Sequence, residues 1–255
     1  MTLRQLALAT ALICSTGAFP AVAQDRQEYA EWSTETRTSL GFRVNAAAVR
    51  SLLPEGWSVA ASADSPDHVN LSVTFMDRHL VLDAQGQAVG TGSSRYMVMS
   101  VQARNDANGQ NSTLIINGIS PEGTGAYEVY QPAVTARADR LRSGLAEDIG
   151  HVEEHWEMVA GSGDSVRLTL SFEQVLPVRR QSRIVIRSGK NTDYTRTYQI
   201  DQASDALGIP GITDSRIESL VFEASGPLYS RLFDGSEVLT GVTATPWYTR
   251  QIFVP

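Results

Sequence analysis

Most of this sequence alternates between apolar and polar residues with a period of two, and this pattern limits the fold more than any other feature. Successive side chains of a β-strand point to opposite faces of a sheet, so the alternation is typical of strands with one buried face. Turns rich in Gly, Asn and Asp separate the alternating segments. The pattern predicts strands over 69–75, 95–103, 112–119, 166–172, 182–188 and 216–224.

Two segments break the alternation and predict helices. Residues 45–53 begin with Asn45, a favourable N-cap, and stop before Pro54. Residues 132–150 begin with a proline, end at a glycine and carry apolar residues every three or four positions, which indicates one apolar helix face. We therefore expect a mainly β (α+β) fold, with a single antiparallel β domain and two or three packed helices.

The first 23 residues have the pattern of a secretory signal peptide. Arg4 precedes a short apolar run, and Ala-Val-Ala forms a small-residue cleavage site at the end of the segment. Cys14, the only cysteine, lies inside this segment, and the isoleucine before it is too large for lipid-anchor processing. We therefore expect a cysteine-free mature chain, periplasmic or secreted from a bacterium, with an extension over 24–37 and one domain over 38–255.

The charge balance disfavours two kinds of partner. The chain has 28 acidic and 21 basic side chains, a net charge of −7, and no block of basic residues. A binding surface for nucleic acid or an anionic membrane needs clustered positive charge. After the N-terminal segment, no run approaches the roughly 20 apolar residues of a membrane span.

The stretch HVEEHWEM begins at His151 and contains two of the four histidines. His151, Glu154 and His155 have the order of the inverted zinc-peptidase motif, which requires a helix. Here the segment follows the predicted helix and leads into a turn and a strand, so a solvated strand face is the simpler interpretation. The alternative is a strand-borne metal site of His151, Glu153 and His155, with His79 as the best candidate for a further ligand. Otherwise the sequence predicts no metal.

The order of elements resembles that of the acetoacetate decarboxylase family. The resemblance implies a single cone-shaped, closed β-barrel whose interior holds a small organic acid. It covers residues 38–253 as a pattern of short motifs. The segments that carry it are 40–57, 69–77, 95–101, 114–120, 155–172, 182–200 and 225–253.

The chemistry of that family depends on a lysine that this chain lacks at the matching place. The family's lysine forms a Schiff base with the substrate ketone. The paired lysines of the family fall at Val129 and Tyr130 of this sequence. Lys190 is the only lysine of the chain, and its neighbours Ser-Gly and Asn predict a surface turn. Schiff-base decarboxylation is therefore disfavoured. The sequence indicates no cofactor.

Other residues match the family's site or replace it. The resemblance implies that Arg43 faces the interior and binds a carboxylate, a role suited to a planar, permanently charged guanidinium. A surface arginine is the alternative. The family's strand glutamate falls at Ser72, and Glu122, beside the altered lysine region, is the candidate compensating substrate-binding residue. Glu128 and Tyr130 are the candidate acid–base residues of a lyase or hydratase.

The sequence thus favours an exported protein that binds a small carboxylate- or carbonyl-bearing molecule in a barrel, with or without a lyase-type reaction. The main alternative is a non-catalytic periplasmic interaction module. A metal-dependent enzyme using His151, Glu153 and His155 is the third hypothesis. Oligomerisation stays open.

Overall fold

The computed structural model describes residues 27–60, 69–144 and 150–255, so the predicted signal peptide lies outside the described residues. Two short helices are α1 (Ala46–Arg50) and α2 (Tyr229–Leu232). The strands are β1 (Glu28–Arg43), β2 (Trp57–Val59), β3 (Leu71–Asp83), β4 (Ser94–Asn105), β5 (Asn111–Ser120), β6 (Gln131–Ser143), β7 (Gly150–Ala160), β8 (Ser165–Gln174), β9 (Val178–Ser188), β10 (Thr195–Gly208), β11 (Ile217–Ser225) and β12 (Val238–Val254).

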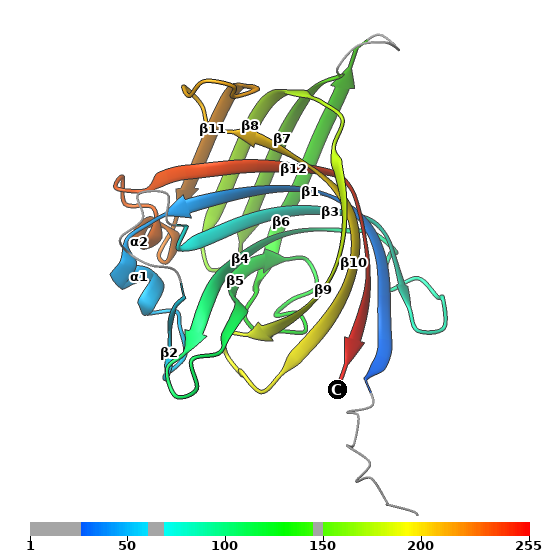
Figure 1. Cartoon of the computed structure of the whole chain (residues 1–255), viewed down its shortest axis with the longest axis vertical. Coiled ribbons are helices and arrows are strands. Elements are labelled where there is room, and N and C mark those ends of the chain that lie inside the picture. The colour runs from blue at the N-terminus through cyan, green and yellow to red at the C-terminus, as the bar shows by residue number, and fades with distance from the viewer. Residues whose placement is uncertain (1–26, 61–68, 145–149) are drawn as a thin grey trace, which may run out of the picture.

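Seven strands pair in a ring, which makes this part of the molecule a barrel. The order is β4, β5, β9, β10, β12, β1, β3 and back to β4. Six of the seven junctions are antiparallel. The junction of β5 with β9 is parallel and short, over Thr113–Ile115 and Ile186–Ser188. In Figure 1 the long strands β1, β10 and β12 bend strongly as they pass around the barrel.

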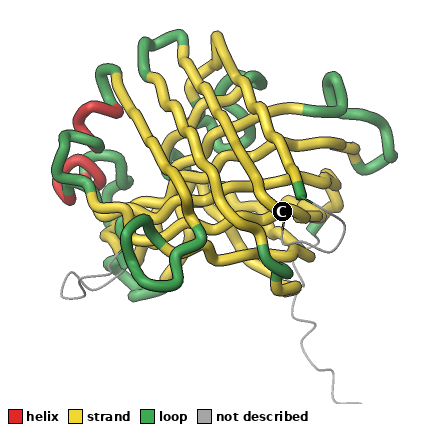
Figure 2. Tube along the Cα trace, turned by 90° about the horizontal axis from the view of Figure 1, so that it is seen from above, coloured by secondary structure: helices red, strands yellow, loops and turns green. Residues whose placement is uncertain are grey.

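The other large sheet, which we call the wing, consists of β6, β7, β8 and β11. It is joined to the barrel by a short parallel pairing of β5 with β6. Figure 1 shows the wing strands rising steeply beside the flatter run of β12, β1 and β3, and Figure 2 shows the two sets of strands crossing. Both helices lie together at one side of the molecule.

Two hydrophobic clusters follow from this arrangement. The larger one lies between the wing and the outer face of the barrel. There the ring centroids of Phe75 and Trp156 are 5.3 Å apart, and those of Phe42 and Phe222 are 4.8 Å apart. The smaller one lies inside the barrel and is rich in tyrosine. Alternate residues of the same strands therefore face two separate clusters.

Each predicted strand is present, and the shorter predicted helix is α1. The Asn45 side chain accepts hydrogen bonds from the backbone N–H groups of Ala47 and Ala48, as expected of an N-cap. The strand β1 begins at Glu28, so residues 28–37, which we expected in an extension, pair with β12 and β3. No helix within the described part of the chain has the length and apolar character needed to cross a membrane.

The predicted helix over 132–150 is wrong: residues 131–143 form β6, and 145–149 lie outside the described residues. The apolar residues that suggested a helix face are not buried together, since Val134 is 69% and Leu141 60% exposed. Ala136 and Ala138, two positions apart, pack on the large core instead. Pairing with β7 along its whole length decides the conformation of this segment.

Candidate functional site

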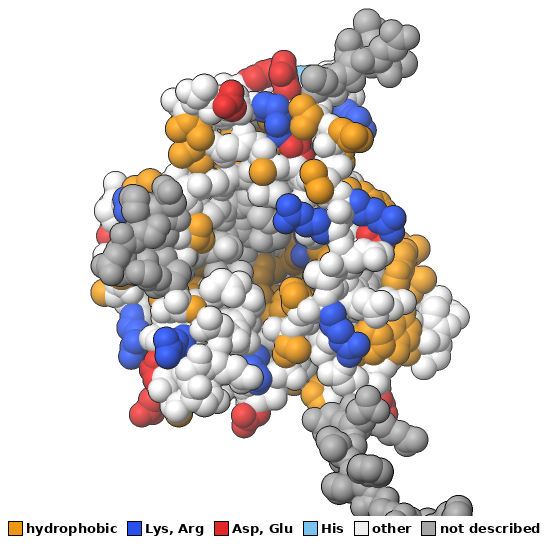
Figure 3. Space-filling view, in the orientation of Figure 1, with side chains coloured by type: hydrophobic (Ala, Val, Ile, Leu, Met, Phe, Trp, Pro, Cys, Tyr) orange, Lys and Arg blue, Asp and Glu red, His pale blue; other side chains and the backbone are white. Residues whose placement is uncertain are grey.

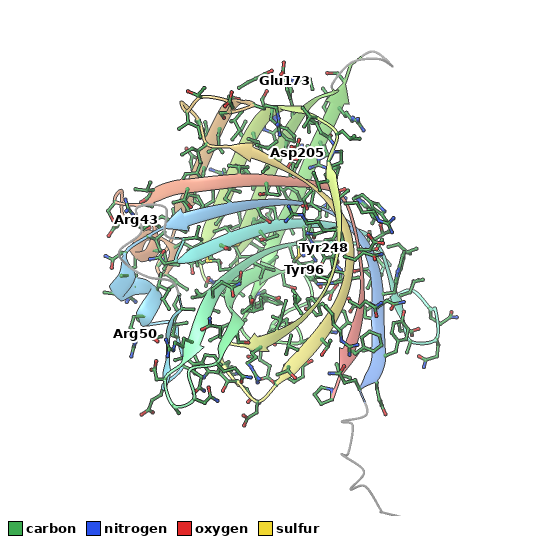
Figure 4. The ribbon with its side chains drawn as sticks, viewed as in Figure 1. Arg43, Arg50, Tyr96, Glu173, Asp205 and Tyr248 are labelled. Carbon is green, nitrogen blue, oxygen red and sulfur yellow. The ribbon has the colours of Figure 1, made fainter. Side chains whose placement is uncertain are left out.

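The candidate site is a cavity of about 100 Å³ inside the barrel. Strands β1, β3, β4, β10 and β12 line it, together with the loop of residues 121–130 between β5 and β6. Its lining is polar and aromatic, with residues Glu31, Met76, Arg78, Tyr96, Glu122, Gly125, Ala126, Tyr127, Tyr130, Arg196, Tyr198 and Arg250. Figure 4 places Tyr96 and Tyr248 within the barrel, near the middle of the molecule.

Three guanidinium groups of the lining surround the carboxylate of Glu31. Arg78 Nη2 lies 3.0 Å and Arg250 Nη2 3.5 Å from Glu31 Oε1. Arg196 Nη2 is more distant, at 3.8 Å from Oε2. The Nε of Arg196 is buried and has no hydrogen-bond partner among the described residues. The Nε of Arg78 is buried without a partner as well, but Arg78 donates two hydrogen bonds through its Nη atoms and Arg250 donates one through its Nε. Arg196 donates none within the described residues, so it is the least satisfied of the three.

A second carboxylate, Glu35, extends the ionic network deeper into the barrel wall. Its Oε1 lies 3.2 Å from Arg250 Nη2, and its Oε2 lies 2.6 Å from Arg37 Nη2. Burial alone would raise the pKa of Glu35, but Arg250, Arg37, a hydrogen bond from Ser33 and Arg78 outweigh it and lower that pKa to about 2. Burial acts to lower the pKa of Arg250, but Glu35, Tyr198, Tyr248 and Glu31 together outweigh it and raise that pKa, so both groups are charged.

The network carries more positive than negative charge. Its guanidinium groups belong to Arg37, Arg78, Arg196 and Arg250, and its carboxylates to Glu31, Glu35 and Glu122. One positive charge is therefore in excess. A buried cation without a counterion is unfavourable, so the cavity is suited to a monoanion.

Four tyrosines complete the lining. The hydroxyls of Tyr127 and Tyr198 are 2.7 Å apart, and Arg78 Nη1 donates to the Tyr96 hydroxyl at 2.7 Å. Burial raises the pKa of Tyr96, Tyr127 and Tyr130. These three phenols therefore stay protonated, and their hydroxyls are available as hydrogen-bond donors in the cavity.

The 121–130 loop brings two of these tyrosines into the barrel because Gly125 allows a close approach. Gly125 has a φ of +60°, and a Cβ atom there would lie 2.4 Å from the Tyr130 ring. Only glycine accepts both conditions without displacing the ring. The buried Ser188 hydroxyl also donates to the Tyr127 carbonyl oxygen at 2.7 Å, which ties the loop to the end of β9.

The structure brings two of the predicted site residues to the cavity. Glu122 and Tyr130 both line it, and Glu122 Oε1 lies 3.7 Å from Arg78 Nη1. Ser72 is half-buried on β3, paired with Ser100, and is not part of the lining.

Two other predicted residues lie on the surface. Arg43 is exposed at the end of β1 near the helices (Figure 4) and is outside the cavity lining. Glu128 is exposed, and its Oε2 lies 3.3 Å from Lys190 Nζ. Lys190 itself lies in the exposed turn between β9 and β10, as the sequence predicted.

HVEEHWEM forms most of β7, as a strand rather than a helix. His151 contacts Glu153 and Glu218, at 3.3 Å each, and the His155 ring contacts the Thr169 hydroxyl. His79 contacts Thr36 instead. Nowhere in the described ranges do three His, Cys, Asp or Glu side chains converge as metal ligands.

Glu154, the glutamate of that motif, is fully buried between the wing and the barrel. Its Oε2 accepts hydrogen bonds from the Thr38 hydroxyl at 2.6 Å and from Trp156 Nε1 at 2.9 Å. Its Oε1 contacts the Arg140 guanidinium on β6. Both carboxylate oxygens of Glu154 thus help to join β6, β7 and β1.

The cavity arginines were missed by sequence reasoning, although a signal exists. Arg78 follows Met76 by two positions, and Arg250 lies between Tyr248 and Ile252 at the same spacing. A charged residue in step with buried aromatic and apolar residues points to the same buried face of its strand. Arginine on the inner face of a strand was therefore the sequence feature that marked the site.

The ring of strands with an interior site and a packed second sheet is the acetoacetate decarboxylase-like fold. An acetoacetate decarboxylase-like enzyme from Sphingomonas wittichii RW1 is similar to this chain, with a TM-score of 0.52 and 10% sequence identity over 88% of this chain and 91% of that one. The enduracididine biosynthesis enzyme MppR, in a structure with HEPES buffer bound, gives a TM-score of 0.50 and 11% identity over 88% and 85% of the two chains.

At these identities the likeness establishes the fold and not the activity. No protein-family model matches the sequence. No curated protein matches it either.

Proposed function

We propose that this protein binds a small organic anion, most simply a carboxylate, in the interior of its barrel. The observation that carries the proposal is the group of buried guanidiniums of Arg78, Arg196 and Arg250 around one cavity, with one positive charge in excess. Arginine binds carboxylates through two parallel hydrogen bonds and keeps its charge when buried. Arg196, whose Nε lacks a partner within the described residues, is the proposed anchor.

The size of the cavity limits the ligand. A volume of about 100 Å³ is well below that of pockets for drug-sized molecules, which begin at about 300 Å³. It corresponds to about three water molecules at their liquid volume, which suits a carboxylate of about two to four carbon atoms. One hydroxyl of the Tyr127–Tyr198 pair donates to the other, so three of the four phenol groups can donate hydrogen bonds to a carbonyl or hydroxyl of the same ligand.

Binding is proposed to be non-covalent. Lys190, the only lysine of the sequence, is exposed and paired with Glu128 outside the cavity lining. A Schiff base with a ligand in the cavity requires a lysine amine that reaches the cavity, and Lys190 lies outside it.

We also propose, from the pattern of residues 1–23, that the protein is exported. N-terminal sequencing of the mature protein tests this, with Gln24 as the expected first residue.

A second candidate function is acid–base conversion of the bound anion by a lyase-type reaction. Tyr130 favours it, because this protonated phenol lines the cavity beside the arginines. Glu128, the other predicted catalytic residue, points to solvent and would take no part. Incubation with acetoacetate, pyruvate and 2-hydroxybutyrate, followed by NMR, tests for turnover that Tyr130→Phe abolishes.

Calorimetry with acetate, pyruvate and acetoacetate, and with acetone as a neutral control, tests the binding proposal. At least one carboxylate should bind, and acetone should not. Arg196→Gln should weaken binding by about tenfold to a hundredfold, which corresponds to about 1.4 to 2.8 kcal/mol. The matched control is Arg50→Gln, because Arg50 is exposed on α1 (Figure 4) and should leave binding unchanged.

Failure of all three carboxylates, or equal effects of the two arginine substitutions, would contradict the proposal. Borohydride reduction in the presence of acetoacetate, followed by mass measurement, tests the non-covalent mode separately. We expect no adduct. A stoichiometric adduct on Lys190 would contradict the non-covalent mode and leave the location of the anion site open.

A further inference from the structure

A polar groove of about 540 Å³ lies on the outside of the barrel, on the opposite face of the strands from the interior cavity. One row of side chains crosses it from strand to strand. By register, Trp32 on β1 lies beside Gln251 on β12, Gln251 beside Gln199 on β10, and Gln199 beside Arg183 on β9. Figure 3 shows hydrophobic and basic side chains next to each other on this side of the molecule, over β9 and β10.

The middle of the row offers hydrogen-bonding groups that the protein itself leaves unused. The side chains of Gln199 and Gln251 are exposed and make no hydrogen bond within the described part of the molecule. Each carboxamide can donate two hydrogen bonds and accept two. Trp32, at one end of the row, is only partly buried and presents an indole surface beside them.

The next row is already ordered by the protein. Asp201 accepts hydrogen bonds from Arg179 Nε at 2.9 Å and from Gln181 Nε2 at 2.7 Å. The Thr249 hydroxyl donates to the Asp201 backbone carbonyl at 3.2 Å. This second row therefore forms a fixed polar wall along the groove, with little rotamer freedom left to lose on binding.

The chemistry of the groove selects a neutral, hydroxyl-rich ligand. An aromatic face next to free carboxamides matches a sugar ring, which has an apolar C–H face and hydroxyls around its rim. Asp201 is paired with Arg179, and Arg250 with Glu35 inside the barrel. Arg183 is therefore the one lining cation without a carboxylate partner among the described residues. A single charge of this kind is too little to attract a polyanion. The backbone groups of β1, β12 and β10 are paired on both sides, so a peptide cannot add a strand to any of these three.

We propose that this groove binds an oligosaccharide, with Trp32 stacking on one sugar ring and Gln251 and Gln199 binding the hydroxyls of the next. The row from Trp32 to Arg183 crosses three strand spacings, about 14 Å in all, which exceeds a single sugar ring. This site uses the outward-facing residues of the same strands, and its lining shares only Arg250 with that of the proposed anion site.

The test uses affinity electrophoresis and calorimetry of the full chain with cellohexaose, maltohexaose, chitohexaose and xylohexaose. At least one hexaose should bind. Trp32→Ala, and Gln199→Ala combined with Gln251→Ala, should each weaken that binding by about tenfold or more. The matched control is Trp247→Ala: Trp247 is also exposed on the outer face of β12 but is not part of the groove lining, so its loss should have little effect. Arg196→Gln should leave hexaose binding intact, which separates this site from the interior one.

Three results would overturn the proposal. The first is absence of binding by all four hexaoses at about 10 mM, well above the dissociation constants of useful sites. The second is an equal loss for Trp32→Ala and Trp247→Ala, which would indicate unspecific adsorption to exposed indoles. The third is Trp32-dependent binding of a decaproline peptide without binding of any hexaose, which would assign the groove to a peptide.

Discussion

Glu154→Gln provides a direct test of how the wing is held on the barrel. Glu154 is fully buried and accepts hydrogen bonds from Thr38, Trp156 and Arg140. The substitution keeps the shape of the side chain but removes its charge. It also places an N–H₂ group against one of the donors.

The size of the effect follows from these contacts. The hydrogen bond with charged Arg140 contributes about 1.5–3 kcal/mol, and a buried donor left unpaired costs about 1–3 kcal/mol. Because the Arg140 side chain is 29% exposed, the lower part of the summed range applies. We therefore expect the free energy of unfolding to fall by about 3 kcal/mol. At about 2–4 °C per kcal/mol for a chain of this length, Tm should fall by about 6–12 °C.

Urea unfolding followed by tryptophan fluorescence, together with calorimetric Tm, measures this loss. Glu153→Gln is the matched control. Glu153 is the preceding residue on β7 and is exposed, so this substitution should lower the free energy of unfolding by no more than about 0.5 kcal/mol. Replacing both Glu154 and Arg140 by methionine should cost less than the sum of the single methionine substitutions. A Glu154→Gln variant as stable as the Glu153→Gln variant would refute the assigned role of the buried carboxylate.

Three further predictions concern the cavity, the loop and the histidines. The pKa of Glu35 is lowered from 4.5 to about 2, so the stability that this carboxylate contributes is fully present above pH 4.5 and is lost as pH falls toward 2. Glu35→Gln should therefore make Tm less dependent on pH in the acid range. An unchanged acid dependence of Tm would contradict the lowered pKa. Gly125→Ala should lower Tm more than Gly123→Ala, because both positions have positive φ but only the former Cβ would meet the Tyr130 ring, at 2.4 Å; equal losses would show that the ring contact is unimportant. Elemental analysis of the dialysed protein should find no stoichiometric metal, and about one zinc per chain that His155→Ala removes would prove this wrong.

The strands could be predicted because burial of alternate residues is recorded in the local sequence. The segment 95–103, for example, lies within β4, with buried Met97, Met99 and Val101 on one face. The resemblance to the acetoacetate decarboxylase fold rested on the same order of strands, and the solved structures support it.

The segment 132–150 was misread because its local pattern fits two periods. Val134, Ala138 and Leu141 have helical spacing, while Ala136, Ala138 and Arg140 have strand spacing. The choice depends on β7, which supplies a full set of backbone partners and the Glu154 carboxylate. Because those partners lie outside the segment, the residue propensities of the segment itself do not reveal them.

The site was predicted only in part, for a related reason. Glu122 and Tyr130 were found because they lie near the place of the family's lysines. Arg78, Arg196 and Arg250 come from strands far apart in the sequence, and only closure of the barrel brings them together. Convergence of this kind depends on strand register around the whole ring, which alternation alone does not determine.

The short parallel junction between β5 and β9 has a consequence for the dynamics of the barrel. It spans Thr113–Ile115 and Ile186–Ser188, whereas β9 and β10 pair over Val178–Arg187 and Thr195–Ser204 without a break in register. Local opening of a sheet costs least where few hydrogen bonds must break. We therefore expect the β5–β9 junction to open transiently, on timescales slower than side-chain motion, while the rest of the ring stays folded. A ligand would enter and leave the enclosed cavity through this opening.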